Sequence, residues 1–338
     1  MVYDLIVVGN GLASQTFLFE LFNDVKKSQN FSVAQIFSED IAPSCSLRST
    51  ATVSPNGIEE GISELGDELK KAYEMFVEFN EKNHPRGVEK VDRFVAFTTE
   101  KEKAKMIRRY KSIDHLTHPL IKEDFLGKKV PSYLVSPELY TNWYEEKLTQ
   151  HKIKKISGFV REISKDSDGL INCKILGNEV FTAKKLVFCS GAYAKLFSQY
   201  FPETKLIENT QIVAGSYLER SVDLKCDSFY FTIGDSNIIY RSEDHKLIVG
   251  SVSSEGAVLV ADIEGLRKIL IMVQEKINLD LGSFLDFQIK TGLRHKGNKR
   301  RPIFRALDDE KCLFLISGFY KNGYTLGHLS AEVIKSQL

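Results

Sequence analysis

Three small residues near the N-terminus have the types and spacing of a dinucleotide-binding turn. Gly9, Gly11 and Ser14 follow the apolar run Leu5–Val8 and precede a stretch with helical spacing of apolar residues. In such a turn the first glycine allows the tight bend, the second lets the backbone approach a pyrophosphate, and a small third residue permits close packing of helix on strand. The N–H groups that begin the helix then face the phosphates. A plain glycine loop is the alternative, but the position between a buried strand and a helix favours the dinucleotide site.

The elements around this turn are predicted to form a β-α-β unit. Leu5–Val8 is a short β-branched run of the kind buried on both faces of a parallel sheet. Gln15–Asn23 is expected to be a helix and Val33–Phe37 the next strand. Glu39 follows that strand and could accept hydrogen bonds from ribose hydroxyls, although it lies further from the glycines than the usual ~20 residues. Ser38, where the strand ends, is the alternative for this contact.

The composition excludes several classes of protein. The 338 residues predict two domains or one large one, and 46 Lys and Arg against 45 Asp and Glu leave no global field for nucleic acid. Five cysteines without a CxxC pair exclude a disulfide framework and favour a reducing compartment. His115 and His118 have no third ligand nearby, so we expect no metal site.

The N-terminus and the hydropathy pattern bear on location. Met1 runs directly into the first strand, with no segment that resembles a signal peptide. No apolar run reaches the roughly 18 residues of a membrane-spanning helix. The expectation is therefore a cytoplasmic protein without membrane insertion.

Apolar spacing further along the chain predicts the remaining elements. Helices are expected over Glu59–Asn80, Glu138–Gln150 and Ile263–Ile277. Strand signals predominate from Gln211 to Val252. Lys185–Ala192 is expected to be a second buried strand that ends in a small-residue turn.

Four segments, taken in order, resemble the FAD-dependent D-amino-acid oxidase and glycine oxidase family. Val7–Ser14 is the glycine turn, and Leu186–Tyr193 is similar to the family's strand that ends in Ala-Gly-Ala-Trp. Thr291–Arg294 is similar to its Gly-Leu-Arg-Pro element, and Ile316–Thr325 to its C-terminal Gly-His-x-x-x-Gly-x-Thr loop. Each segment is a weak signal alone, but their order and spacing cover nearly the whole chain.

This resemblance implies an α/β fold, in which a Rossmann-like FAD-binding domain is interleaved with an α+β substrate domain roofed by a mostly antiparallel sheet. Residues 1–60, 137–205 and 290–338 would form the FAD-binding domain. Residues 61–136 and 206–289 would form the substrate domain. The FAD would be held non-covalently.

The resemblance also implies which residues contact the cofactor. Val160 would lie near the adenine, and Cys45–Thr50 beside the ribityl chain and the flavin ring. A polar surface loop is the alternative for Ser46, Arg48 and Ser49. The full set of expected FAD-binding residues is Gly9, Gly11, Leu12, Ala13, Ser14, Ser38, Glu39, Ser46, Arg48, Ser49, Val160, Ser190, Gly191, Gly318, Asn322, Gly323, Tyr324 and Thr325.

The C-terminal loop has a physical reason to contact a flavin. A flavin that accepts a hydride gains negative charge at its N1–C2=O edge, and backbone N–H groups or a helix N-terminus directed there stabilise the reduced form. Gly318 and Gly323 allow close approach, and a helix that begins near Thr325 would supply the dipole. A glycine-rich turn capping the last helix would use the same residues, and the accompanying fingerprint favours the flavin contact.

Arg294 is the residue with the largest consequence for substrate choice. In the family, the matching arginine holds the substrate carboxylate in a bidentate salt bridge, a task that suits a guanidinium fork. Tyr240, on the roofing sheet, is a second candidate for a catalytic contact, with a core position as the alternative. The alternative for Arg294 is a surface arginine, because the basic run His295–Arg301 follows it.

That basic run departs from the family pattern. His295 stands where the family has proline, Lys299 replaces a frequent acid, and Arg305 replaces a frequent glycine. The run could bind an acidic substrate or a partner, or be solvated. Ile248 stands where sarcosine-oxidase-like members have a lysine, which disfavours that branch.

The function implied is FAD-dependent oxidation of a C–N bond in a small amine or amino acid. The neutral amine would pass a hydride from its α-carbon to flavin N5, and the imine would hydrolyse in water. Arg294 would supply orientation, and no side-chain base is required. The alternatives are a flavin-binding subunit that has lost its substrate site, and an enzyme acting on aminomethyl groups of tRNA, against which the balanced charge argues. An oligomer or a partner subunit is compatible with the sequence.

Overall fold

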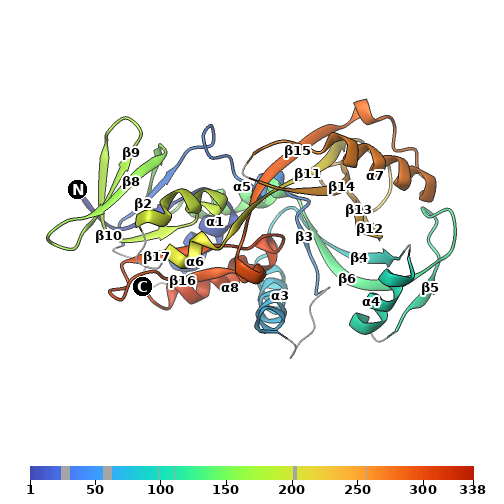
Figure 1. Cartoon of the computed structure of the whole chain (residues 1–338), viewed down its shortest axis with the longest axis horizontal. Coiled ribbons are helices and arrows are strands. Elements are labelled where there is room, and N and C mark those ends of the chain that lie inside the picture. The colour runs from blue at the N-terminus through green and yellow to red at the C-terminus, as the bar shows by residue number, and fades with distance from the viewer. Residues whose placement is uncertain (24–30, 56–62, 98, 111, 201–203, 257) are drawn as a thin grey trace. The chain divides into compact units, whose positions relative to one another are not determined.

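The chain divides into two compact units, each built from separate segments. The structure is a computed structural model that describes residues 1–23, 31–55, 63–97, 99–110, 112–200, 204–256 and 258–338. Unit 1 comprises Met1–Leu47, Thr141–Val213 and Leu293–Leu338, and unit 2 comprises Arg48–Tyr140 and Ala214–Gly292 (Figure 1).

Unit 1 is built on a mainly parallel sheet. Its strands follow the order β16-β17-β10-β1-β2-β7, in which β16 runs antiparallel to β17 and the others are parallel. A pair of antiparallel strands, β8 and β9, continues from β10. The bounds are β1 (Val2–Val8), β2 (Val33–Phe37), β7 (Ile153–Ser157), β8 (Val160–Lys165), β9 (Ile171–Ile175), β10 (Val180–Phe188), β16 (Ile303–Ala306) and β17 (Leu313–Ser317).

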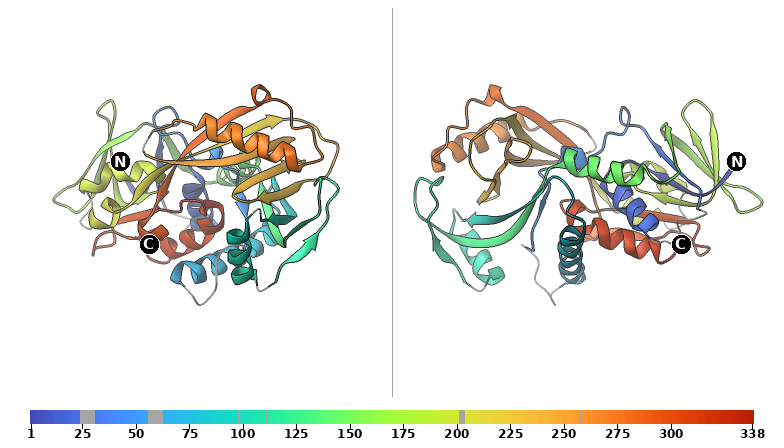
Figure 2. Two further views of the ribbon diagram at one scale, coloured as in Figure 1. Left: turned by 45° about the vertical axis from the view of Figure 1, so that its right-hand side comes forward. Right: turned by 180° about the vertical axis from the view of Figure 1, so that it is seen from behind.

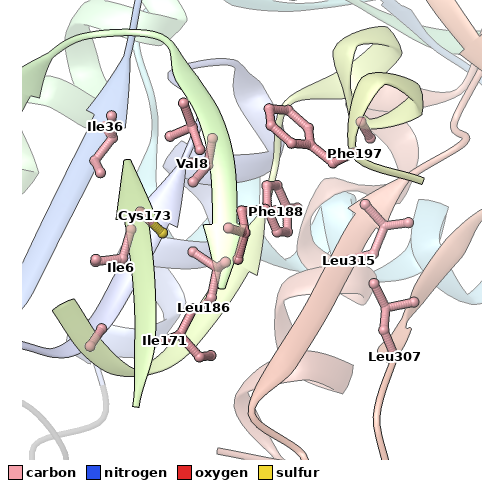
Figure 3. Close-up of a cluster of buried hydrophobic side chains, with 14 of the residues drawn as sticks. Ile6, Val8, Ile36, Ile171, Cys173, Leu186, Phe188, Phe197, Leu307 and Leu315 are labelled. Carbon is pink, nitrogen blue, oxygen red and sulfur yellow. The ribbon is translucent and has the colours of Figure 1, made fainter. Parts of the chain in front are cut away.

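Alternate residues of the central strands face two different cores. On β1, Ile6 and Val8 join one buried cluster with residues of β8, β9 and β10, which Figure 3 shows. Leu5 and Val7 join the opposite cluster. Since both faces are buried, each strand is apolar at successive positions, which explains the continuous apolar run of the sequence.

Helices cover the two faces of this sheet. On one face, α1 (Leu12–Asn23) and α8 (Gly323–Lys335) lie side by side (Figure 2). A Cβ atom added to Gly327 of α8 would lie 3.1 Å from Thr16 Cγ2 of α1, so these helices pack closely. The other face packs against η2 (Gly191–Tyr200), α6 (Thr204–Glu208) and the β8–β9 pair.

Unit 2 is built on a mostly antiparallel sheet of order β15-β11-β14-β13-β12-β4-β6-β3, with β5 paired to β6. Among its described pairs, β12 and β4 are parallel. The strand bounds are β3 (Thr52–Val53), β4 (Val88–Ala96), β5 (Asp114–Leu116), β6 (Phe125–Val135), β11 (Gln211–Ser221), β12 (Phe229–Ile233), β13 (Ser236–Arg241), β14 (Lys246–Glu255) and β15 (Gln288–Lys296). The remaining described elements of the chain, from both units, are η1 (Ser46–Arg48), α3 (Glu64–Asn83), α4 (Glu100–Tyr110), α5 (Pro137–Leu148), α7 (Ile263–Lys276), η3 (Phe284–Asp286) and η4 (Asn298–Arg300).

The two faces of the unit 2 sheet differ in character. Phe229 and Phe231 of β12 pack with Leu266 and Leu270 of α7 in an apolar core. Tyr230, between them, joins a separate cluster on the opposite face. The period of two along a strand produces this separation.

The expected domain boundaries differ from the observed division at all four junctions. Residues 137–140 and 290–292 fall in unit 2 instead of unit 1. The expected break between residues 60 and 61 lies outside the described residues. Arg48–Pro55 falls in unit 2, because Thr52 pairs with Leu134 of β6. Residues 206–213 fall in unit 1, where Ile207 is part of the core.

The expected helices are present with shifted ends. The helix expected over Glu59–Asn80 is α3, which begins at Glu64, and the part of that expectation over 59–62 lies outside the described residues. Its N-cap is Ser63, whose side chain accepts from Gly66 N. Within the described residues, the structure holds no helix that is long and apolar enough to cross a membrane.

Candidate functional site

The carboxyl ends of three neighbouring parallel strands bring small residues together at one edge of the unit 1 sheet. Gly9 follows β1, Ser190 and Gly191 follow β10, and Gly318 follows β17. The crevice outside the carboxyl ends of strands in an open α/β sheet is where ligands bind in this architecture. The sequence-predicted glycines therefore meet at the position where a ligand is expected.

Gly9 cannot be replaced by a residue with a side chain. Its φ is +121°, and an added Cβ would lie 2.5 Å from the carbonyl oxygen of Cys189. The chain is this crowded because Gly9 N donates to Ile36 O at 2.8 Å, while Cys189 N donates to Val8 O at 2.8 Å. The bend after β1 thus follows from the pairing of three strands.

Two helix N-termini reach the same edge. Leu12, at the start of α1, donates its N–H to Ser46 Oγ at 3.1 Å, and Tyr324, in the first turn of α8, donates its hydroxyl to Ser46 O at 3.0 Å. Ser46 therefore connects the starts of both helices. Each helix end carries partial positive charge from its free N–H groups, so the edge attracts anions.

The first turn of α1 is stabilised by a hydrogen bond between its own residues. Ser14 is fully buried and its hydroxyl donates to Gly11 O at 2.7 Å, which keeps the third position of the fingerprint compact. Leu12 is buried and Ala13 packs against the core of unit 1, so these two residues offer only backbone to a ligand.

Several buried polar atoms at and near this edge have no hydrogen-bond partner among the described residues. They are Ser190 Oγ, Ser44 Oγ and both amide atoms of Gln15. A buried polar group left unsatisfied costs about 1–3 kcal/mol. The Cβ that a side chain would add at Gly11 lies 3.2 Å from Ser44 Oγ, which places that hydroxyl against the fingerprint turn. A ligand rich in hydroxyl and phosphate oxygens, such as FAD, fits these donors and acceptors.

Glu39 lies beside the glycine turn. Its carboxylate accepts from Asn10 Nδ2 at 3.4 Å and from Ser44 N at 3.3 Å. The side chain is exposed, so it remains accessible to ribose hydroxyls. Ser38, the alternative, is half-buried, and its carbonyl accepts from Ala42 N. The contacts of Glu39 with the turn favour Glu39 for the ribose.

Gln35 is a supporting residue that sequence reasoning missed. It is buried, and its Nε2 donates to Gly9 O at 3.0 Å and to Asn10 Oδ1 at 3.2 Å. A polar residue inside the apolar strand Val33–Phe37 was the signal that could have found it.

The expected residues of the 46–49 segment divide between the two units. Ser46 belongs to unit 1, whereas Arg48 and Ser49 belong to unit 2. Ser49 Oγ accepts from Ala51 N at 3.1 Å, and Ser49 O accepts from the Tyr217 hydroxyl at 3.4 Å. Ser49 is therefore used within unit 2, and Arg48 is half-buried.

Val160 and Gly191 offer backbone rather than side-chain contacts. Val160 begins β8 and is 2% exposed within the apolar core of unit 1, so its side chain is not available to a ligand. Gly191 has a φ of +55° and no heavy atom within 4 Å of an added Cβ. Its turn thus leaves the backbone open on that side.

The C-terminal loop leads directly into α8. Gly318 has a φ of +76°, and an added Cβ would lie 3.3 Å from Ile303 N. Asn322 precedes the helix and donates its N–H to Phe319 O at 2.9 Å. The helix begins at Gly323, two residues before the expected start at Thr325, so Tyr324 and Thr325 lie in its first turn.

Arg294 lies on β15 and is half-buried. The residue after it does not belong to a surface basic run. His295 is 4% exposed and forms hydrogen bonds with Ser317 Oγ at 2.6 Å and Thr210 Oγ1 at 2.7 Å. Burial and the nearby Lys195 ammonium lower the pKa of His295 to about 4, so the ring is neutral at pH 7.

Two other cations of that run, half-buried Lys296 and exposed Arg300, lie near Tyr320 together with exposed Lys321 of the C-terminal loop. Lys296, Arg300 and Lys321 lie 5.9, 5.8 and 5.5 Å from the centroid of the Tyr320 ring, respectively. These distances are within the range of cation–π attraction. The basic surface therefore gathers around one aromatic ring.

Tyr240 occupies a core position, which argues against the catalytic contact expected for it. It is 1% exposed and packs against Phe229 on the face of the sheet that α7 covers. Its hydroxyl accepts from Leu224 N at 3.2 Å. Arg241 is also structural, because it donates to Val135 O at 2.9 Å and pairs with Asp244 at 3.0 Å.

The opposite face of the same sheet carries polar side chains that sequence reasoning missed. Arg93 donates from Nε to Thr232 Oγ1 at 2.8 Å, and its guanidinium lies 4.7 Å from the centroid of the Tyr230 ring. Asn237 Oδ1 accepts from Thr232 Oγ1 at 2.8 Å and lies 3.5 Å from the Tyr230 hydroxyl. The alternation of Phe229 to Ile233, apolar and polar in turn, was the available signal.

His118, one of the two histidines considered as metal ligands, packs among aromatic side chains. The His118 ring packs against Phe94 and Phe231, and its Nδ1 accepts from Leu120 N at 3.2 Å. Burial lowers the pKa of His118. His115 is exposed on β5.

The comparisons with known proteins agree with this geometry. A family model described as DAO, FAD dependent oxidoreductase, matches residues 4–337. The fold is similar to glycine oxidase from Bacillus cereus ATCC 14579, with 16% sequence identity and a TM-score of 0.80 over 99% of this chain and 94% of that chain. It is also similar to FAD-bound L-alpha-glycerophosphate oxidase from Mycoplasma pneumoniae, at 14% identity and a TM-score of 0.80 over 100% and 95% of the two chains.

A third similar structure is L-proline dehydrogenase from P. horikoshii, at 14% identity and a TM-score of 0.78 over 99% and 92% of the two chains. No curated protein sequence matches this chain. At such identities the structural likeness shows the fold, and it confirms the expected class, a Rossmann-like α/β domain with an interleaved α+β domain.

The fingerprint turn gives a direct test of cofactor binding. Replacing Gly11→Asp places a carboxylate where the backbone would approach a pyrophosphate, so we expect the variant to lose FAD. The measurement is flavin absorbance per protein after desalting. Ser167→Asp is the control, because it adds the same charge at an exposed turn residue of unit 1 and should leave the flavin content unchanged. Equal flavin content in both variants would contradict the assignment of the turn.

Proposed function

Because the chain belongs to the DAO family of FAD-dependent oxidoreductases, we propose that it oxidises the C–N bond of a small amine or amino acid. The family match confirms FAD as the expected cofactor and an oxidoreductase as the expected activity. The bond that is oxidised, the substrate and the site residues are the proposal.

The single observation that carries the proposal is the carboxyl edge of the unit 1 sheet. Gly9, Gly191 and Gly318 lie at the ends of adjacent strands, and the N-termini of α1 and α8 reach the same edge. We place the non-covalently bound FAD there. When bound, FAD accepts the hydride from the substrate at N5.

The chain's own residues have three tasks in this proposal. The N–H groups at the start of α8 and the backbone around Gly318 stabilise negative charge on the reduced ring. Arg294 binds the substrate carboxylate through its guanidinium fork, which orients the α-carbon. The imine product leaves for water, where it hydrolyses, so no acid–base side chain is required.

The printed names of similar structures support an amino-acid substrate. They include glycine oxidase, iminodiacetate oxidase and L-proline dehydrogenase, whose substrates each carry a carboxylate beside a C–N bond. One carboxylate-binding arginine would serve all of these substrates. We therefore place a carboxylate on the substrate of this protein.

A panel of amino acids tests the reaction itself. We expect anaerobic incubation with at least one small amino acid to bleach the flavin absorbance of the purified protein, because hydride transfer reduces the ring. If no member of an amine and amino-acid panel bleaches the flavin, the chain is better described as a flavin-binding subunit. Salt-dependent binding of tRNA would instead support the tRNA-modifying alternative.

The role of Arg294 predicts a change in kinetics rather than in fold. Losing one partner of a desolvated charge pair costs about 2–5 kcal/mol, so Arg294→Ala should lower kcat/KM by about two to three orders of magnitude. Arg294→Lys should keep FAD but lose the bidentate geometry. Decarboxylated amines should be poor substrates, and their rates should change little in either variant. Arg305→Ala, at an exposed arginine of β16, should leave kcat/KM unchanged.

Two buried tyrosines of the unit 2 sheet are expected to stabilise the fold rather than contact substrate. Tyr230 is 2% exposed and its hydroxyl lies 3.5 Å from both Thr52 Oγ1 and Asn237 Oδ1, so Tyr230→Phe should lower thermal stability and leave kcat/KM unchanged. Tyr240→Phe removes a hydroxyl that serves Leu224 N and should have the same effect. A loss of kcat/KM in Tyr240→Phe without a loss of stability would return the catalytic contact to Tyr240.

A further inference from the structure

His295 connects four segments of unit 1 through its side chain. Nδ1 is hydrogen-bonded to Ser317 Oγ at 2.6 Å and Nε2 to Thr210 Oγ1 at 2.7 Å. Ser317 in turn donates to Gly191 O at 3.0 Å. Thr210 O accepts from Lys195 Nζ of η2 at 2.5 Å. One buried ring thus joins β15, the end of β17, the Gly191 turn and the start of β11.

The backbone of the same residue holds the C-terminal loop. His295 O accepts from Tyr320 N at 2.9 Å, and Gly297 N donates to Gly318 O at 3.4 Å. Lys296 and Phe319 form a β-bridge. The loop that contains Gly318 is therefore attached to β15 at His295 by both side chain and main chain.

The geometry of β15 means that the burial of His295 also fixes the direction of the Arg294 side chain. Successive side chains on a strand point to opposite faces, and both residues lie within β15. Burying His295 on one face therefore directs Arg294 to the other. A shift of one residue in this strand would exchange the two side chains and remove the arginine from its position.

We propose that His295 is a positioning residue, which holds Arg294, the Gly191 turn and the Gly318 loop in one fixed arrangement. The inference rests on the proposed function, because it assigns the arrangement a role in binding a substrate carboxylate. It also gives a role to a residue that stands where the sequence pattern led us to expect proline. A proline at this position would have no side-chain group to bond Thr210 or Ser317.

The partners of the neutral His295 ring determine which ring nitrogen donates and which accepts. The Thr210 hydroxyl donates to Ile207 O, so Nε2 carries the ring hydrogen and donates to Thr210 Oγ1. Nδ1 is then an acceptor for Ser317. The hydroxyl hydrogen of Ser317 is consequently shared between His295 and Gly191 O. The ring therefore acts on the Gly191 turn through Ser317.

The surroundings favour the neutral form. Among the described side chains, the charged groups on the elements packed around the ring are Lys195 on η2, Glu208 on α6, Glu219 and Arg220 on β11, and Lys290, Arg294 and Lys296 on β15. Burial is the main cause that lowers the pKa of His295 to about 4, and the Lys195 ammonium adds to it. Glu208 is exposed to solvent, where its charge is screened. The arrangement is therefore constant across the neutral pH range.

Two substitutions test whether His295 acts through its hydrogen bonds or only by filling space in the core. His295→Gln can donate to Thr210 and accept from Ser317, so its kcat/KM for the best amino-acid substrate should stay within about threefold of wild type. His295→Phe keeps a ring but neither hydrogen bond, and should lower kcat/KM by about 100-fold while FAD stays bound. The loss should appear mainly in KM, because carboxylate binding depends on Arg294. Decarboxylated amines should be affected little by His295→Phe.

His328→Gln is the matched control. His328 is 2% exposed, and its ring nitrogens bond Tyr144 OH and Glu20 Oε1, each at 3.0 Å. We expect this change to lower the melting temperature and leave KM unaltered. Equal KM values for wild type and His295→Phe would overturn the inference, as would a matching rise of KM in His328→Gln.

A second measurement needs no substrate. Since folding lowers the His295 pKa from 6.5 to about 4, the unfolded chain binds more protons over this range, and stability must fall as pH drops from about 6.5 towards 4. His295→Gln should remove part of this fall in melting temperature. If the protein oxidises no amine, the proposed function fails, but this measurement still tests whether the buried, hydrogen-bonded His295 holds its surroundings. If His295→Gln kept the full pH dependence of the wild type, the positioning role of His295 would be overturned while the proposed function would stand.

Discussion

The close contact between α1 and α8 is the constraint on which the candidate site depends. Gly327 lets α8 approach Thr16 of α1, where an added Cβ would lie 3.1 Å from Thr16 Cγ2. Because the helices lie side by side, both N-termini reach the carboxyl edge of the sheet, where Ser46 bonds to each. Both helix ends carry partial positive charge, so this edge favours a phosphate-bearing ligand. The glycine turns and the unsatisfied hydroxyl of Ser190 belong to this same edge.

The features that sequence reasoning predicted well are those that depend on neighbouring residues. The run Leu5–Val8, the turn at Gly9 and the helix after it are local in sequence, and the structure forms each of them. Helix ends differ by a few residues because caps decide them, as Ser63 does for α3. The interleaved arrangement of two domains was predicted from the order of the four segments that resemble the family.

The features that it missed depend on contacts distant in sequence. His295 looked like one cation in a basic run, yet Thr210 and Ser317, 85 and 22 residues away, supply hydroxyls that let it be buried. Tyr240 was chosen without knowing which face of its strand α7 covers. A strand has two faces, so an error of one position moves a side chain from one face of the sheet to the other. Local alternation in Phe229–Ile233 marks the faces, but only the partner helix tells which face is covered.

The interleaving of the chain has a consequence for how the protein is made. Unit 1 takes its first strands from Met1–Leu47 and its last elements from Leu293–Leu338, with all of unit 2 synthesised between them. As the chain leaves the ribosome, β1 and β10 are exposed before β17 and α8 exist to cover them. The apolar faces of this half-built sheet must stay protected from aggregation until the final segment arrives. The whole of unit 2 is synthesised before that segment, so the cofactor edge of unit 1 is the last part of the fold to be completed.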